Sequence, residues 1–168
     1  MTNSIKTFSN YFAILLLTSF LAACATAPTE TTSSTSTSQS QVVGGVYVGN
    51  ETIEMLAVDV PDRVFFAYDS YSLAASAQAT LNKQAKWLKA NPSVAIAVEG
   101  HADERGTREY NLALGDSRAS SVKDYLMSQG ISSNRISTIS YGKERPVKSG
   151  SNDTAWAQNR RSVSVRTN

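Results

Sequence analysis

Charged side chains concentrate in the segment Glu99–Thr107, which reads EGHADERGT, and another basic residue, Arg118, follows. Arg118 comes four residues after Leu114 and four before Val122. A helix with this spacing puts the guanidinium on the same stripe as apolar core positions. A charge on an inward stripe should have a partner, because an unpaired buried charge is costly. The spacing therefore predicts a buried or half-buried ion pair.

The carboxylates expected to meet Arg118 are Asp69 and Asp103, each at the end of a predicted strand. With Arg105 and Thr107 they would form a polar pocket on one rim of the domain. A guanidinium fork suits a carboxylate, and a neighbouring carboxylate suits an ammonium. The ligand that fits this pair is an amino-acid head group. A closed internal Asp–Arg salt bridge without any ligand fits the pattern equally well.

Other chemistries have less support in the composition. Carboxylates at Glu99, Asp103, Glu104 and Glu109 offer an acid/base pair of the kind glycosidases use. One His and one Cys leave little room for a metal site or a nucleophilic triad. A formal charge of +2 does not indicate nucleic-acid binding. We therefore expect a non-enzymatic binding protein without metal or cofactor.

The elements that must position these residues follow from periodicity. Residues 63–68 (RVFFAY) read as a strand because β-branched and aromatic residues dominate. A helix is expected over 73–89, with capping oxygens from Asp69, Ser70 and Ser72. Asn91-Pro92 stops this helix. Its apolar positions step by three or four, as one helix face requires, at Leu73, Ala77, Leu81, Ala85 and Leu88.

The remainder of the domain alternates in the same way. Residues 94–98 predict a central strand and 108–128 a second helix, whose inward face carries Tyr110 and Leu114 and which ends before Gly130. Strands follow at 135–141 and 162–166, with a short helix around 154–161 between them. The order predicts an α+β fold, a two-layer α/β sandwich of βαβαβ type with helices on one sheet face. Residues 42–48 precede them, either as a short strand or as an ordered lead-in.

The first part of the chain has a different composition. Residues 1–23 have one charged side chain, Lys6, followed by an apolar run too short to span a membrane comfortably, which is typical of a signal peptide. Residues 24–41 contain eleven Ser or Thr and predict a flexible tether. The folded domain is then expected over 42–168.

Leu21-Ala22-Ala23-Cys24 resembles the lipobox of bacterial lipoproteins. This resemblance implies cleavage before Cys24 and lipidation of its thiol. Ala25 stands where lipoproteins retained in the inner membrane typically carry Asp. The resemblance therefore implies an anchor in the outer membrane, with the domain in the periplasm.

The segment Gly100–Leu126 (GHADERGTREYNLALGDSRASSVKDYL) resembles the signature of the OmpA-like peptidoglycan-binding family. Within that family it looks like the peptidoglycan-associated lipoproteins. Further matches are VFFAYD at 64–69, ISYGKERP at 139–146 and NRR at 159–161. The resemblance implies that Asp103 and Arg118 hold the amino and carboxylate groups of meso-diaminopimelate in the stem peptide, on a site lined also by Asp69, Arg105, Thr107 and Leu114.

The same resemblance implies partners. They are peptidoglycan, TolB and other Tol proteins, acting in envelope integrity and cell division. A related OmpA-like lipoprotein that binds the wall without Tol partners is the alternative. Charge adds one independent observation: residues 42–134 carry eight basic and eleven acidic side chains, whereas 135–168 carry seven and two. The basic C-terminal part would suit either solvent or an acidic partner.

Overall fold

The computed structural model describes residues 42–43, 46–47 and 55–167. The predicted signal peptide, the tether and Cys24 lie outside the described residues. Two short antiparallel pairs come first, β1 (Val42–Val43) with β2 (Val46–Tyr47), and β3 (Met55–Ala57) with β4 (Val60–Pro61). No helix of the described part is long and apolar enough to cross a membrane.

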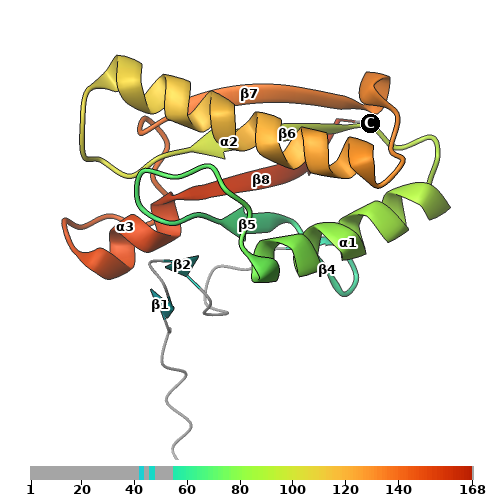
Figure 1. Cartoon of the computed structure of the whole chain (residues 1–168), viewed down its shortest axis with the longest axis horizontal. Helices are drawn as coiled ribbons and strands as arrows, with labels where there is room; N and C mark the ends of the chain where they lie inside the picture. The colour runs from blue at the N-terminus through green and yellow to red at the C-terminus, as the bar shows by residue number, and fades with distance from the viewer. Residues whose placement is uncertain (1–41, 44–45, 48–54, 168) are drawn as a thin grey trace, which may run out of the picture. The chain divides into compact units, whose positions relative to one another are not determined.

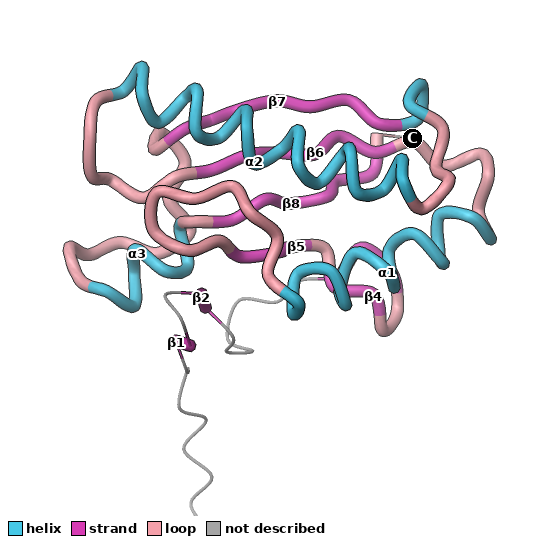
Figure 2. The backbone as a smooth tube through the Cα atoms, viewed as in Figure 1, coloured by secondary structure: helices cyan, strands magenta, loops and turns pink. Residues whose placement is uncertain are grey.

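A four-stranded sheet forms the centre of the domain, in the order β5-β8-β6-β7 (Figures 1 and 2). Its strands are β5 (Arg63–Phe65), β8 (Arg161–Arg166), β6 (Ile96–His101) and β7 (Ile136–Gly142). The β6–β7 pair is parallel, whereas β8 pairs antiparallel with both β5 and β6. The last strand therefore lies inside the sheet, between two strands that come before it in the chain.

Helices α1 (Ala75–Ala90) and α2 (Arg108–Ser128) both lie on one face of this sheet (Figure 1). A short 3₁₀ turn, Ser133–Arg135, precedes β7, and α3 (Asp153–Asn159) precedes β8. The core lies between the helices and the sheet, with side chains from every layer. Its most buried members include Phe66, Leu81, Leu88, Ile96, Val98, Val122 and Leu126. The predicted two-layer fold with helices on one face is confirmed.

The start of α1 differs from the prediction. The helix begins at Ala75, and its N-cap residue Ala74 has no side-chain hydrogen bond. The expected capping residues Asp69 and Ser70 have other contacts: Asp69 accepts from Tyr110, and the Ser70 carbonyl accepts from Arg118. Both contacts lie at the rim of the domain, so Asp69 and Ser70 contribute to that rim and do not cap α1.

Helix α2 is placed by two glycines. A Cβ on Gly100 of β6 would lie 1.8 Å from the carbonyl oxygen of Gly115 on α2. Only glycine at position 100 permits this approach, because a side chain there would overlap the helix backbone. The close contact brings the first half of α2 down onto the end of β6, which is where the charged segment begins.

Candidate functional site

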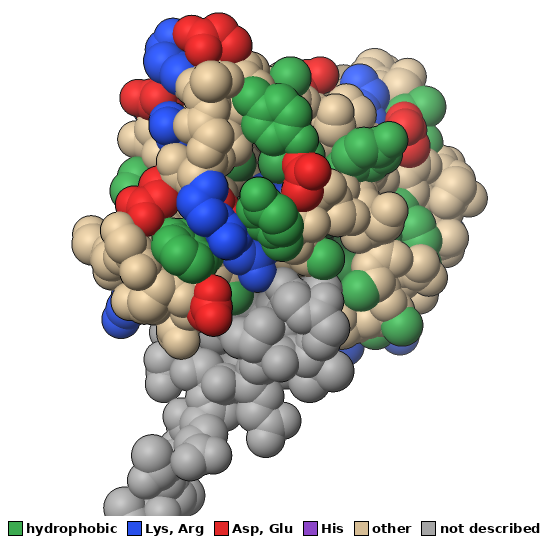
Figure 3. All heavy atoms as spheres, turned by 60° about the vertical axis from the view of Figure 1, so that its left-hand side comes forward, with side chains coloured by type: hydrophobic (Ala, Val, Ile, Leu, Met, Phe, Trp, Pro, Cys, Tyr) green, Lys and Arg blue, Asp and Glu red, His purple; other side chains and the backbone are tan. Residues whose placement is uncertain are grey.

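A cavity of about 190 Å³ opens at the end of the domain where β6 ends and α2 begins. Figure 3 looks toward this end, where acidic, basic and hydrophobic side chains lie next to one another. Five of the six predicted peptidoglycan-binding residues line the cavity: Asp69, Asp103, Arg105, Leu114 and Arg118. Four further residues line the cavity and were not predicted as site residues: Tyr68, Gly106, Tyr110 and Asn111.

The loop that carries Asp103 and Arg105 is held by side chains from two other elements. Lys143, directly after β7, donates to the carbonyls of Glu104 and Gly106 at 3.2 and 2.7 Å. Asn111 of α2 donates to the carbonyls of Arg105 and Thr107 at 2.8 and 3.0 Å. The loop backbone is therefore fixed without help from a ligand.

Asp103 is a buried carboxylate, 4% exposed, with a dense set of donors. Arg105 donates to it three times: from Nε at 3.0 Å, from Nη2 at 2.7 Å and from the backbone N–H at 3.1 Å. Arg160 adds a longer contact of 3.4 Å. Burial favours the protonated acid, but the hydrogen bonds from Arg105 outweigh it and hold the Asp103 pKa below its usual value. The carboxylate is therefore charged at neutral pH.

Arg118 is fully buried, and its partners differ from the prediction. Its guanidinium donates to three backbone carbonyls: Ser70 at 2.8 Å, His101 at 2.8 Å and Ala67 at 3.2 Å. No hydrogen bond from Arg118 to Asp69 or Asp103 exists among the described residues, so the alternative of a closed Asp–Arg118 salt bridge is wrong. Carbonyl groups satisfy the cation instead, since the loop after β5 and the last residue of β6 turn their carbonyls toward it.

Burial lowers the pKa of Arg118 to about 10. The guanidinium therefore stays protonated at neutral pH despite its position. A guanidinium has five N–H donors, of which three are used on the carbonyls. Because Arg118 lines the cavity, a carboxylate that enters the cavity would meet a fixed positive charge with N–H donors still unused.

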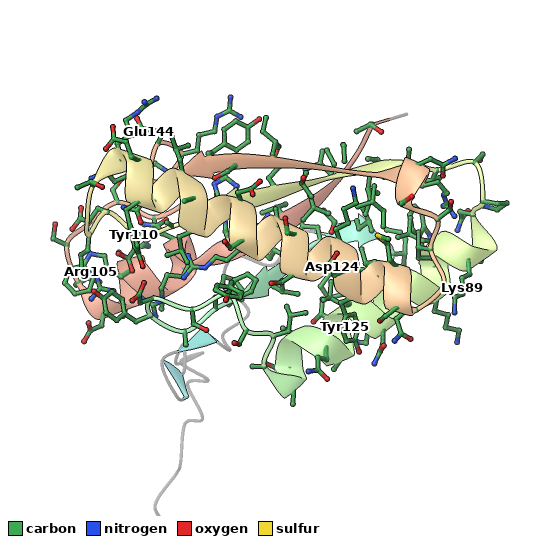
Figure 4. All side chains as sticks on the ribbon, turned by 45° about the horizontal axis from the view of Figure 1, so that its top comes forward. Lys89, Arg105, Tyr110, Asp124, Tyr125 and Glu144 are labelled. Carbon is green, nitrogen blue, oxygen red and sulfur yellow. The ribbon has the colours of Figure 1, made fainter. Side chains whose placement is uncertain are left out.

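Asp69 and Tyr110 line the cavity as a pair. The Tyr110 hydroxyl donates to Asp69 Oδ1, and this hydrogen bond raises the Tyr110 pKa. Asp69 adopts a positive φ of 50°, a conformation that Asp tolerates better than most residues. Tyr110 was expected on the inward face of α2, but it is 51% exposed. Figure 4 labels Arg105 and Tyr110, which lie at the N-terminal end of α2.

Thr107 lies next to the cavity without lining it. It is the N-cap of α2, and its hydroxyl oxygen accepts from the Tyr110 N–H at 3.2 Å. An N-cap Thr satisfies one of the free N–H groups of the first turn. The structure thus gives Thr107 a role in starting the helix that carries Leu114 and Arg118.

His101 and Glu99 point to the helix-free face of the sheet, because they alternate with the core residue Val98 along β6. The His101 ring is buried, with Nε2 3.5 Å from a Glu99 carboxylate oxygen. Burial and the nearby Arg161, Arg145 and Arg63 lower the His101 pKa to about 3. Of the carboxylates considered for hydrolysis, only Asp103 lines the cavity.

Fold and cavity together define a class: a two-layer α/β domain with a small cavity that combines a buried carboxylate with a buried guanidinium. A sequence model of the OmpA family matches residues 65–160. The chain therefore belongs to the OmpA family.

Individual relatives agree with this assignment. The chain is 58% identical over 108 residues to the peptidoglycan-associated lipoprotein of Brucella melitensis, covering 64% of each chain. It is 50% identical over 97 residues to the protein of that name from Pseudomonas aeruginosa, covering 58% of this chain and 57% of the other. The matched region thus spans somewhat less than two thirds of these relatives' length.

Solved structures give the same result for the fold. The crystal structure of the peptidoglycan-associated lipoprotein from Burkholderia pseudomallei is 43% identical, with a TM-score of 0.62, and the match covers 63% of this chain and 90% of that one. The C-terminal domain of MotB from Helicobacter pylori has a TM-score of 0.60 at 22% identity, over 64% of this chain and 84% of that one. The second likeness concerns the fold alone.

Proposed function

We propose that this chain is an outer-membrane lipoprotein that binds the peptidoglycan stem peptide non-covalently and so ties the outer membrane to the cell wall. One observation carries the proposal: the cavity holds an ionised carboxylate, Asp103, and a protonated guanidinium, Arg118, on a preformed loop and helix. The relatives are named peptidoglycan-associated lipoproteins, which supports peptidoglycan as the polymer that is bound.

The free end of meso-diaminopimelate carries an amine and a carboxylate on one carbon. We assign the ammonium to the acidic side of the cavity, Asp103 and Asp69, and the carboxylate to Arg118. Arg105 already pairs with Asp103, so the ammonium shares that carboxylate with a guanidinium. Leu114 supplies apolar contact for the methylene chain of the ligand.

The site is tested with purified sacculi and the full-length protein. We expect Asp103→Asn and Arg118→Lys to lose most of the bound fraction, whereas Asp124→Asn, an exposed residue of the same helix, should bind like wild type (Figure 4). Thermal melts verify that each variant is folded. Unchanged binding by a folded Asp103→Asn protein would refute the assignment.

A pair of soluble peptides tests the ligand chemistry more sharply. A tripeptide that ends in meso-diaminopimelate should compete with sacculi, whereas the tripeptide ending in lysine lacks the second carboxylate and should compete poorly. Equal competition by both peptides would show that Arg118 does not receive that carboxylate.

The anchor and the protein partners are separate parts of the proposal. Lipidation of Cys24 predicts that palmitate labels the wild-type chain and not Cys24→Ala, and that only the wild type fractionates with outer membranes. TolB and other Tol proteins are the proposed partners in envelope constriction. Co-purification with TolB, measured with and without peptidoglycan, separates this function from that of a wall-binding lipoprotein without Tol partners.

A further inference from the structure

The guanidinium of Arg105 lies between two aromatic rings from different parts of the chain. Its central carbon is 4.2 Å from the centroid of the Tyr68 ring and 4.1 Å from the centroid of the Trp156 ring. Tyr68 follows β5, and Trp156 belongs to α3. A planar cation has two faces, so each ring takes one of them. Cation–π contacts of this kind are favourable, most of all with Trp.

The edge of the same guanidinium is directed at Asp103. Nε and Nη2 donate to the two carboxylate oxygens at 3.0 and 2.7 Å, which is a bidentate arrangement. Faces and edge together leave Arg105 few alternative positions, although its side chain is 33% exposed. Most arginines with that exposure gain little from an ion pair, because they must give up side-chain entropy to form it. Here the Tyr68 and Trp156 rings already restrict the Arg105 side chain, so forming the ion pair costs less side-chain entropy.

Trp156 is itself held in place. Its indole Nε1 donates to Glu104 Oε1 at 2.9 Å, and Glu104 is the residue between Asp103 and Arg105. Hydrogen bonds from Ser151 and Trp156 lower the Glu104 pKa, so the acceptor is charged at neutral pH. Trp156 of α3 thus contacts two residues of the loop: its indole N–H donates to Glu104, and its ring lies against the Arg105 guanidinium.

We infer that Tyr68 and Trp156 act as an aromatic clamp, which positions Arg105 on Asp103 and thereby sets the geometry in which the cavity receives a ligand ammonium and carboxylate. This inference rests on the proposed function and extends it to α3. Trp156 is a positioning residue in this account, since it acts through Arg105, whereas Tyr68 also lines the cavity. The clamp makes the Asp103–Arg105 pair a fixed unit of the site.

Binding of the meso-diaminopimelate tripeptide to full-length variants tests the clamp. Trp156→Leu and Tyr68→Leu should each weaken binding about fivefold, within the range expected for a lost cation–π contact. Trp156→Phe keeps an aromatic face and should remain within about twofold of wild type. The matched control is Tyr141→Leu, which removes a ring stacked on another arginine, Arg145, at 3.7 Å, and should not change binding.

A double-mutant cycle with Arg105→Ala separates positioning from direct contact. If Trp156 acts through Arg105, then Trp156→Leu has no further effect in the Arg105→Ala background. A fivefold loss that persists there would overturn the inference, because Trp156 would then touch the ligand itself. Equal binding by wild type and both leucine variants would overturn it as well.

A readout without ligand keeps the clamp distinct from the proposed function. Carbon-13 titration of the Asp103 carboxyl should show a higher pKa in Trp156→Leu than in wild type, because Arg105 is less well held. An unchanged Asp103 pKa would refute the clamp even if the tripeptide binds. Absence of tripeptide binding by wild type, together with the expected pKa change, would refute the function and leave the clamp intact.

Discussion

The cavity and the helix-free face of the sheet both gather arginines, but the acceptors of these arginines are arranged differently. In the cavity, Arg105 and Arg118 meet a carboxylate and three carbonyls, so each positive charge is matched by acceptors. On the helix-free face, a groove of about 500 Å³ is lined by Arg63, Arg161 and Arg166 together with Glu99 and apolar side chains. Asp62 also lines this groove, where Arg63 donates to both of its carboxylate oxygens at 2.8 and 3.1 Å, and Arg161 donates to the Arg145 carbonyl at 3.2 Å. Charge alone therefore does not distinguish the two regions: Arg63 pairs with the carboxylate of its own groove, whereas Arg118 is held by carbonyls and pairs with neither carboxylate of the cavity.

The largest expected effect is on stability, and it distinguishes the two arginines of α2, Arg118 and Arg108. Arg118→Met removes the donor for three carbonyls and should lower the free energy of unfolding by about 3–5 kcal/mol. Arg108→Met is the control, because Arg108 is largely exposed and pairs only weakly with Glu144 at 3.4 Å. Its effect should stay within about 0.5 kcal/mol. Urea denaturation measures both, and similar small losses would contradict the structural role of Arg118.

The next prediction concerns the helix-free face and the dependence of stability on pH. The His101 pKa is about 3 in the folded protein, below its ordinary value of 6.5, so in this interval the unfolded chain binds more protons. Stability must then fall as pH falls below about 6.5, and His101 should account for about 2 kcal/mol of the loss between pH 7 and pH 5.

The variant His101→Phe removes this titration. Unfolding free energies of wild type and variant, each measured at pH 7 and pH 5, should show the loss only in wild type. The same loss in both proteins would mean that another group is responsible. The Asp103 pKa is shifted downward. The stability that this shift contributes is therefore fully present above the unfolded pKa of 3.8 and is lost only at more acid pH.

The smallest expected effect concerns Thr107 at the edge of the cavity. Thr107→Ala removes an N-cap and should cost about 1 kcal/mol, whereas Thr107→Ser retains the capping oxygen and most of the stability. Binding of the tripeptide by folded Thr107→Ala should equal that of wild type. A loss of binding without a loss of stability would instead make Thr107 a ligand contact, as the family resemblance implies.

Periodicity predicted the elements well where the pattern was long. The expected helix over 108–128 matches α2 residue for residue, because its apolar stripe is long and Gly130 marks its end with a φ of 88°. The predicted start of α1 was wrong, because Asp69, Ser70 and Ser72 resemble capping residues in the sequence. In the structure, Asp69 and Ser70 contribute to the cavity rim. Local pattern cannot distinguish these two uses of the same side chains.

The site was predicted in part for a similar reason. The stripe Leu114–Arg118–Val122 correctly indicated a buried guanidinium, but its extension back to Tyr110 predicted an inward side chain, whereas Tyr110 is exposed and lines the cavity. The acceptors of Arg118 are backbone carbonyls, which every residue has and no sequence pattern marks. The Arg105 stack on Trp156 joins residues about fifty positions apart, and no local signal reports it.

The position of β8 has a consequence for the order in which the domain folds. Val64 of β5 pairs with Ser162 of β8, so nearly the whole domain separates two neighbouring strands. Pairing across such a distance is slow, because a long loop must close before the contact forms. Arg160, directly before β8, also contacts Asp103. We therefore expect the cavity to acquire its final charge balance only after the last strand has been inserted into the sheet, so a chain that has not yet placed β8 would lack the complete site.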